Sequence, residues 1–276
     1  MIIDSHQHFW KYNPQEFDWI EGESLKKDFL PKDLEPIFKE NGVSGCIAVQ
    51  ARQSHAENDF LLGLAEKYSF IKGIIGWVDF KAENIENKLE NYTAEAKIKG
   101  FRHVVQGEPD PIFILQPDFL NGIKKLKNYD LVYEILVFPH QLPAVLEFVK
   151  LFPEQKFVLD HIGKPYIARG FYKAWAVMIK ELAMHANVFC KISGLVTEAD
   201  PQNLTYKKLQ PYLEHIIEQF GADRILFGSD WPVCTAVASY AEVMQIAEKA
   251  VKNTLSASES EKFWSANAIK IYNLDV

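Results

Sequence analysis

Histidine and aspartate residues follow three of the short apolar runs in this sequence. His6 and His8 close the first run, His161 closes a later one, and Asp230 closes the last. On a β-strand, side chains two residues apart point the same way, so His6 and His8 can aim at one point, as two ligands of a single metal ion must. Imidazole and carboxylate groups are also the usual general acids and bases. These four residues are therefore the predicted reaction centre.

Further polar and aromatic side chains near the same run ends are candidates for contacting a ligand. Planar amide and guanidinium groups pair with hydroxyls and carboxylates, and indole rings stack on the flat faces of ligands. For Arg52 and His103, a structural salt bridge is an equal alternative, and for the two tryptophans core packing is. The predicted substrate-binding residues are Gln50, Arg52, Trp77, His103, Lys164 and Trp231.

Eight apolar runs of strand length, rich in Val, Ile and Phe, alternate with segments of helical periodicity. This alternation predicts βαβ units and a parallel sheet. Eight units fit a closed (β/α)8 barrel, in which the carboxyl ends of all strands meet on one face. An open doubly wound sheet is the alternative, but no Gly-x-Gly-x-x-Gly loop follows the first run. The predicted strands are residues 2–5, 43–49, 73–78, 101–105, 131–137, 156–159, 188–192 and 225–227.

Several residues mark where the intervening helices should begin and end. Serine followed three positions later by glutamate predicts helix starts at Ser54, Ser239 and Ser258. Glycine after a lysine-rich or amphipathic run predicts helix ends at Gly100 and Gly221.

Composition places the chain among ordinary globular proteins. Its composition is 48% hydrophobic and 24% charged, and its 276 residues suit two small domains as well as one barrel domain over residues 1–276, which is the arrangement that we expect. The net charge of −7 argues against binding to nucleic acid or a membrane surface. No signal-peptide pattern opens the chain and no apolar stretch is long enough to span a bilayer, so we expect a soluble, cytoplasmic protein.

The cysteines and one aromatic segment each allow two interpretations. The three cysteines are far apart and form no Cys-x-x-Cys pair, which favours buried, unreactive side chains over metal ligands or nucleophiles. Residues 9–29 carry several aromatic side chains between the first strand and the first helix. This segment either covers the barrel mouth or forms a satellite hydrophobic cluster.

Five segments, in this order, resemble the amidohydrolase superfamily and, within it, the sugar lactonases of the L-fuconolactonase and L-rhamnonolactonase type. A His-x-His pair alone is shared by many hydrolases, whereas the ordered set is far more specific. The resemblance covers nearly the whole chain and implies a (β/α)8 barrel that hydrolyses a lactone or other carboxylic ester. The segments are residues 6–8, 49–54, 100–110, 160–165 and 228–232.

The resemblance also implies roles for the four central residues. Asp230 would be the proton shuttle, taking a proton from the attacking water and returning it to the leaving oxygen. His6 and His8 would ligate a divalent metal or bind the carbonyl end of the substrate, and His161 would polarise the substrate or stabilise the oxyanion. These roles match what lactone hydrolysis requires: a base, oxyanion stabilisation and a proton for the departing alkoxide.

The chain departs from the fuller superfamily pattern at two strands. Many relatives bring a carboxylated lysine from the fourth strand and a histidine from the fifth. Here the fourth strand offers His103, and the only charged residue of the fifth is Glu134. Two metals are therefore not expected. One divalent ion such as Zn²⁺, held by His6, His8 and Asp230 with Glu134 as a further candidate, and a metal-independent centre remain alternatives; Glu134 could instead lie inside the barrel bound to a neighbour.

The leading hypothesis is thus hydrolysis of a sugar-derived lactone, such as L-fucono- or L-rhamnono-lactone; the expected partner is this small molecule, and the sequence does not indicate an oligomeric state. One alternative is an aromatic, pyrone-dicarboxylate-like lactone hydrolase or a decarboxylase of the same superfamily; the decarboxylase would want a histidine on the fifth strand. Another is a sugar-binding barrel without catalysis. The sequence does not indicate which lactone or ring size is used.

Overall fold

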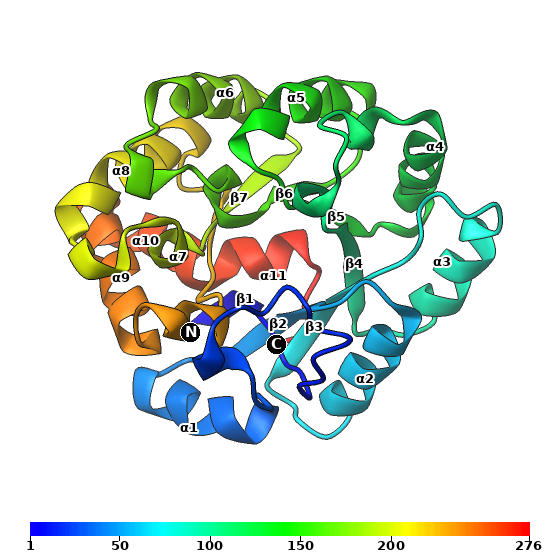
Figure 1. The fold of residues 1–276 in the computed structure, drawn as a ribbon, viewed down its shortest axis with the longest axis horizontal. Coiled ribbons are helices and arrows are strands. Elements are labelled where there is room, and N and C mark those ends of the chain that lie inside the picture. Colours follow the sequence, from blue (N-terminus) through cyan, green and yellow to red (C-terminus); the bar gives the residue numbers. More distant parts are fainter.

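Eight parallel strands form a ring at the centre of the molecule, and helices surround it (Figure 1). The structure, a computed structural model, describes all 276 residues. Each strand pairs in parallel with the next along the chain. The strands are β1 Ile3–Gln7, β2 Gly45–Val49, β3 Ile71–Gly76, β4 Ile98–His103, β5 Val132–Ile135, β6 Phe157–Leu159, β7 Val188–Ile192 and β8 Ile225–Phe227.

The ring closes between β1 and the segment that follows β8. The backbone N–H of Asp230 donates to the carbonyl of His6 at 2.8 Å, and that of His8 donates to the carbonyl of Trp231 at 2.7 Å. The two edges of the sheet are therefore joined, which confirms the predicted (β/α)8 barrel and excludes the open sheet. Closure also sets the two histidines of β1 beside the aspartate that follows β8.

Amphipathic helices cover the outside of the ring, with their apolar faces against the strands. None of them is long and apolar enough to cross a membrane. The helices are α1 Pro31–Asn41, α2 His55–Ala65, α3 Ile85–Thr93, α4 Pro117–Leu126, α5 Leu142–Leu151, α6 Lys173–Ala183, α7 Leu195–Glu198, α8 Tyr206–Phe220, α9 Tyr240–Thr254, α10 Ala257–Glu261 and α11 Asn267–Ile271, with a π-helical turn Lys262–Ala266 between the last two.

All eight predicted strands are present, but β3 and β4 begin two and three residues earlier than predicted, at residues 71 and 98 instead of 73 and 101. The prediction that Gly100 ends a helix was wrong, because Gly100 lies inside β4. A Cβ there would stand 2.2 Å from the carbonyl oxygen of Val132 on β5. Glycine is needed because two backbones come close together, and not because a helix stops.

The serine and glycine patterns predicted the following helix starts and helix end correctly, except for one start that was predicted two residues too late. Ser54 caps α2, Ser239 forms the reciprocal capping box of α9 with Glu242, and Gly221 ends α8. The third box was predicted two residues too late, since α10 is capped by Ser256 and not by Ser258. Two overlapping Ser-x-x-Glu patterns occur there, and local pattern alone does not choose between them.

The C-terminal segment closes the end of the barrel at which the strands begin. In Figure 1, α11 (red) crosses the ring of strands. Ala268, Ile271, Tyr272 and Leu274 pack there with apolar side chains that point into the barrel: Ile3, Ile47, Val49, Ile75, Val132, Val158, Phe189 and Leu226. The reaction face must therefore lie at the opposite end.

The aromatic segment 9–29 packs at the end where the strands stop. Phe9, Trp10 and Phe29 are buried in the main core, and Phe9 and Phe29 contact the Trp231 ring. Trp19, 43% exposed, donates its indole N–H to the carbonyl of Ala51 just after β2. The segment is thus part of the hydrophobic core and at the same time a wall of the barrel mouth. The three cysteines are buried and unpaired, as expected.

Candidate active site

His6, His8, His161 and Asp230 lie together at the end of the barrel where the strands stop. The Nε2 atoms of His6 and His8 are 3.2 Å apart. Asp230 Oδ1 is 3.4 Å from Nε2 of His8 and 3.8 Å from Nε2 of His6. The ring centroids of His6 and His161 are 4.4 Å apart. No member of the group is more than 6% exposed, so the structure brings together all four residues predicted as the reaction centre.

A left-handed backbone conformation positions the side chains of Asp230 and His161. Asp230 has φ 59°, and His161 opens a run of four consecutive residues, 161–164, with φ between 47° and 72°. Such a conformation costs a residue with a Cβ roughly 1–2 kcal/mol. Strain of this kind persists where the surroundings impose it, and it concentrates at functional sites. With this backbone conformation, the side chains of Asp230 and His161 both lie beside His6 of β1.

Hydrogen bonds to Asp4 of β1 hold the segment that contains Asp230 next to this strand. The buried carboxylate of Asp4 accepts hydrogen bonds from the backbone N–H groups of His6 and Ser229, at 3.1 and 2.9 Å. It also accepts from the hydroxyls of Ser229 and Tyr240, at 2.6 and 3.0 Å. Burial raises the pKa of Asp4 to about 6, although all four donors favour the ionised form. The Ser229 bonds hold the backbone next to Asp230 in place.

Four charged side chains fill the barrel beneath the histidines. Arg102 of β4 donates to Asp160 at 2.9 Å, and Lys191 of β7 donates to Glu134 of β5 at 2.6 Å and lies 3.3 Å from Asp160. All four are at most 3% exposed. Two cations face two carboxylates, so the charges compensate one another. Buried ions require such pairing because an isolated buried charge is very costly.

His6 is the point at which these charges meet the reaction centre. Its Nδ1 is 3.3 Å from Asp160 Oδ1, and its Nε2 is 3.4 Å from Nη1 of Arg102. Burial lowers the pKa of His6, so its imidazole is neutral near pH 7. Burial would raise the pKa of Asp160, but Lys191, His6 and Arg102 hold it well below its usual range.

The other members of the centre have fixed hydrogen-bond partners. His8 donates from Nδ1 to the carbonyl of Val49 at 2.8 Å, and this bond directs its Nε2 toward the centre. His161 Nδ1 is 2.9 Å from the Ser193 hydroxyl, and burial lowers the pKa of His161 to about 4. Burial would raise the pKa of Asp230, but the three histidines hold it far below its usual range. Asp230 is therefore an ionised carboxylate beside two imidazoles, those of His6 and His161, whose pKa burial lowers.

The residues present fit a single divalent metal ion. Ligand atoms about 2.0–2.2 Å from a tetrahedral Zn²⁺ stand roughly 3.3 Å from one another. The separations of 3.2, 3.4 and 3.8 Å among His6, His8 and Asp230 are of that size. Both histidines also have the carboxylate or carbonyl neighbour at Nδ1 that ligating histidines usually have. His161, His6 and Asp230 offer a second possible triplet of the same cluster.

Glu134, the further ligand candidate, lies elsewhere. It is completely buried and bound to Lys191 and to the hydroxyl of Tyr272, each at 2.6 Å. Although His6, Glu134 and Asp160 lie close enough together to surround an ion, the Lys191 ammonium stands among them. The structure thus realises the alternative in which Glu134 is bound to a neighbour inside the barrel.

The predicted substrate-binding residues separate into two sets. Arg52 forms ion pairs with Glu57 at 2.9 Å and Glu16 at 2.6 Å. His103 pairs with Glu108 at 2.7 Å and stacks on Phe113. For both side chains, the structure contains the salt bridges that were the alternative to substrate contact. Trp231 is 2% exposed and packs in the core.

Gln50 and Trp77 retain buried polar atoms without a partner, and Lys164 lies at the mouth with one ion pair. Gln50 is fully buried and its Oε1 has no hydrogen-bond partner; the indole Nε1 of Trp77 is also buried without one. Unpartnered buried polar atoms are unusual and call for an explanation such as a ligand. Lys164 is partly exposed at the mouth and pairs with Glu198 on α7 at 3.0 Å.

Several residues of the site had no predicted role. Asp160 precedes His161 and was seen only as part of a motif, and Lys191 stands in the otherwise apolar run 188–192. A charged residue inside a strand of a closed barrel must find a partner across the interior, so its presence there was a usable signal. Ser193 and Glu198 carried no local signal. The residues to which the sequence analysis assigned no role are Asp4, Asp160, Lys191, Ser193 and Glu198.

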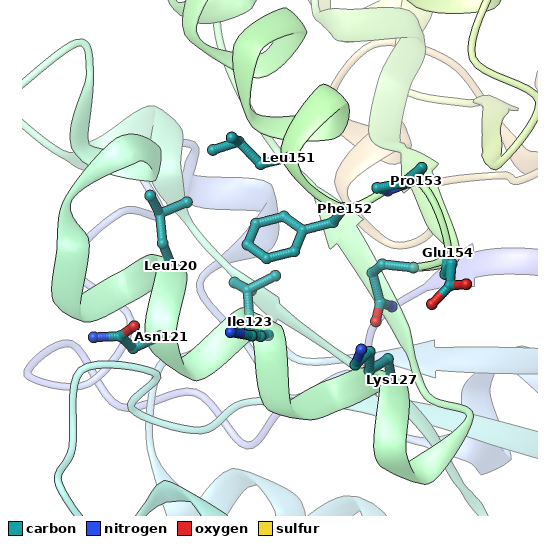
Figure 2. A pocket seen from close by; sticks show the side chains of 10 residues that line it. Leu120, Asn121, Ile123, Lys127, Leu151, Phe152, Pro153 and Glu154 are labelled. Carbon is teal, nitrogen blue, oxygen red and sulfur yellow. The ribbon is translucent and has the colours of Figure 1, made fainter.

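A surface hollow of about 390 Å³ lies between α4 and α5 (Figure 2), away from this centre. It is lined by the ends of both helices, which lead into the starts of β5 and β6. It is therefore at the opposite end of the barrel from the histidines. None of its lining residues is one of the predicted site residues.

Comparison with known proteins places these features in a family. The sequence profile of the amidohydrolase family matches residues 3–274. An L-fucono-1,5-lactonase of Burkholderia multivorans is 38% identical over 284 residues, covering 99% of this chain and 96% of the relative. An L-fucono-1,5-lactonase of Burkholderia ambifaria is 33% identical over 278 residues, with 99% and 96% covered.

A solved structure agrees with the fold over its full length. The crystal structure of an amidohydrolase from Burkholderia multivorans with bound zinc is 39% identical, has a TM-score of 0.94, and is covered completely, as is this chain.

Proposed function

This chain belongs to the amidohydrolase family, and we propose that it hydrolyses the 1,5-lactone of L-fuconic acid, or a closely similar aldonolactone, to the free sugar acid. It is a hydrolase of carboxylic ester bonds, as its named relatives are. The single observation that carries the proposal is the ionised, buried Asp230 beside His6, His8 and His161 in a chain that matches two L-fucono-1,5-lactonases over 99% of its length.

Asp230 is proposed to move the proton. Water adds to the lactone carbonyl carbon while its proton passes to the carboxylate of Asp230. The bond from that carbon to the ring oxygen then breaks, and the proton passes from Asp230 to the departing alkoxide. The products are one carboxylic acid and one hydroxyl on the same open chain. An ionised carboxylate at the start is what the first transfer requires, and the neighbouring histidines maintain it.

The positive and polar groups around Asp230 are proposed to stabilise the developing oxyanion. His161 is neutral, and a ring N–H can donate to an oxyanion without first losing a proton. Arg102 adds a buried positive charge 3.4 Å from His6. Fixed donors in a buried site are effective because they need no reorganisation during the reaction.

His6, His8 and Asp230 are proposed to hold one divalent metal ion, and their donor set favours Zn²⁺. When bound, the ion would polarise the lactone carbonyl and make a bound water more acidic.

Gln50, Trp77 and Lys164 are proposed to contact the sugar part of the substrate. The free Oε1 of Gln50 and the free indole N–H of Trp77 can accept from and donate to hydroxyl groups. Lys164 can donate to a ring substituent at the mouth. Arg52 and His103, engaged in ion pairs, are proposed to shape the mouth instead.

The proposal is tested with purified protein and a panel of L-fucono-1,5-lactone, L-rhamnono-γ-lactone and L-galactono-lactone, with acid release followed by a pH indicator. We expect fastest turnover of the L-fucono compound, and a loss of about 10²–10⁴-fold in kcat in Asp230→Asn. Asp223→Asn, the same change at an exposed aspartate, is the matched control. Binding of the lactones without turnover would instead indicate a sugar-binding barrel.

A further inference from the structure

We propose that Lys191 is a positioning residue of the reaction centre, which holds Asp160 against His6 so that the His6 ring keeps its orientation. The inference rests on the proposed function insofar as His6 belongs to the centre. It assigns a purpose to a charged side chain that the reaction itself does not use.

Lys191 lies beneath the histidines, and its ammonium stands between the carboxylates of Glu134 and Asp160 and away from the barrel mouth. The other residues of β7 are Val188, Phe189, Cys190 and Ile192, all buried. A buried ion pair is a weak source of stability, since its replacement by apolar residues of similar volume is often neutral or stabilising. Stability alone therefore does not account for a lysine at this position.

Upward, toward the centre, Lys191 forms a triangle with Asp160 and His6. Its Nζ is 3.3 Å from Asp160 Oδ1 and 3.2 Å from His6 Nδ1, and those two atoms are 3.3 Å apart. A lysine ammonium can only donate. In the structure the ammonium is within hydrogen-bond distance of His6 Nδ1, and Asp160 Oδ1 has ion-pair neighbours but no well-aligned hydrogen-bond donor. A buried carboxylate oxygen without a donor is costly, so we assign the proton of His6 to Nδ1, where it faces Asp160, and the ammonium protons to Glu134 and Asp160.

This arrangement determines what His6 offers to the centre. The partner at one ring nitrogen of a histidine fixes the tautomer and the orientation of the other nitrogen. With Nδ1–H directed at Asp160, the lone pair of Nε2 faces His8 and Asp230. Arg102 holds the second oxygen of Asp160 at 2.9 Å. Lys191 and Arg102 together thus fix both oxygens of the carboxylate that orients His6.

From below, Glu134 and Tyr272 fix Lys191 itself. Glu134 Oε1 is 2.6 Å from the ammonium and accepts the hydroxyl proton of Tyr272, also at 2.6 Å. The Tyr272 ring lies 5.7 Å below the ammonium. Tyr272 follows α11, which closes the barrel. The ammonium is therefore held between a carboxylate, an aromatic ring and Asp160, and its position defines that of Asp160.

The test separates positioning from charge compensation with two variants. Lys191→Met leaves Glu134 and Asp160 with one cation between them, and we expect both the melting temperature and kcat to fall. Lys191→Met combined with Glu134→Gln removes one charge of each sign, so compensation is restored. The double variant should therefore regain most of the melting temperature while its kcat remains about 10–100-fold below wild type, as for other residues that support ligating histidines.

The KM of the double variant should stay within about twofold of wild type, because the Lys191 ammonium stands away from the barrel mouth. A matched control is Lys156→Met combined with Asp130→Asn, which removes another ion pair of 2.6 Å, at the outer surface, and should leave kcat unchanged. Recovery of kcat together with melting temperature in the Lys191 and Glu134 double variant would overturn the proposal, since charge compensation would then explain Lys191 fully.

Failure of the proposed function is distinguishable from failure of this inference. If wild-type protein hydrolyses no lactone of the panel, the substrate assignment fails, and crystal structures of wild type and double variant decide the role of Lys191. A displaced Asp160 carboxylate with a reoriented His6 ring supports positioning. An unchanged Asp160–His6 contact near 3.3 Å overturns it.

Discussion

Replacement of Gly194 by alanine tests how tightly His161 is held. Gly194 directly precedes α7 and has φ +65°, and an added Cβ would stand 2.5 Å from Nδ1 and 2.7 Å from Cγ of His161. Contacts this short cannot persist, so the ring must move. Gly42→Ala is a matched control, because Gly42 has φ +68° but nothing within 4 Å of the added atom. Both variants carry the same backbone cost, and only one has the clash.

The expected magnitudes follow from these two terms. A left-handed alanine costs about 1–2 kcal/mol, and the stiffer unfolded chain returns about 0.4–1 kcal/mol. Gly42→Ala should therefore destabilise by about 1 kcal/mol. Gly194→Ala adds an overpacking cost of about 1–3 kcal/mol. At roughly 2 °C per kcal/mol for a chain of this size, the melting temperature should fall by about 2 °C in the control and about 4–8 °C in Gly194→Ala.

Activity should distinguish the two variants more sharply than stability does. Displacement of a site residue by about 1 Å can cost on the order of 10²-fold in rate. We expect a loss of that order in kcat/KM for Gly194→Ala and none for Gly42→Ala, measured by pH-indicator hydrolysis beside thermal unfolding. Equal stability of the two variants, with full activity in both, would refute the inference that the His161 ring packs too closely against Gly194 to accommodate a Cβ atom.

Three further outcomes are expected. Complete chelation should abolish lactone turnover and Zn²⁺ should restore it; turnover that survives a chelated, metal-free preparation would establish a centre that works without metal. Tyr272→Phe should lower the free energy of unfolding in denaturant by about 1.5–3 kcal/mol, because Glu134 loses a hydrogen bond to its carboxylate, and an unchanged midpoint would contradict the contact. Lys164→Met should raise KM with little change in kcat if Lys164 only binds the sugar, whereas a fall in kcat at constant KM would place it in the chemistry.

The part of the site that could be predicted depends on regular geometry. His6 and His8 share a face because strand side chains alternate, and Asp230 joins them because a closed barrel sets its last strand beside its first. Neither inference needs to know what any side chain touches. The same reasoning located the eight strands, with errors of up to three residues at the boundaries of β1 to β6.

Pairing across the barrel could not be predicted in this way. Lys191 and Glu134 are 57 positions apart, and sequence alone does not say which charged residue of one strand meets which of another. Arg52 and His103, in contrast, have partners that are close in the sequence. Glu57 and Glu108 are each five positions further along the chain. Salt bridges of Arg52 and His103 were predicted as alternatives to substrate contact, but their partner residues were not predicted and come from the structure.

The contacts that assemble the centre join early and late parts of the chain. Asp4 and Ser229 are 225 positions apart, and Glu134 meets Tyr272 at a separation of 138. During synthesis, His6 emerges long before the residues that complete its surroundings. A ribosome-bound chain that stops before the β8 segment has no Asp230, and one that stops before Tyr272 has no partner for the buried Glu134. The centre should therefore be assembled late in folding, because such distant contacts form slowly.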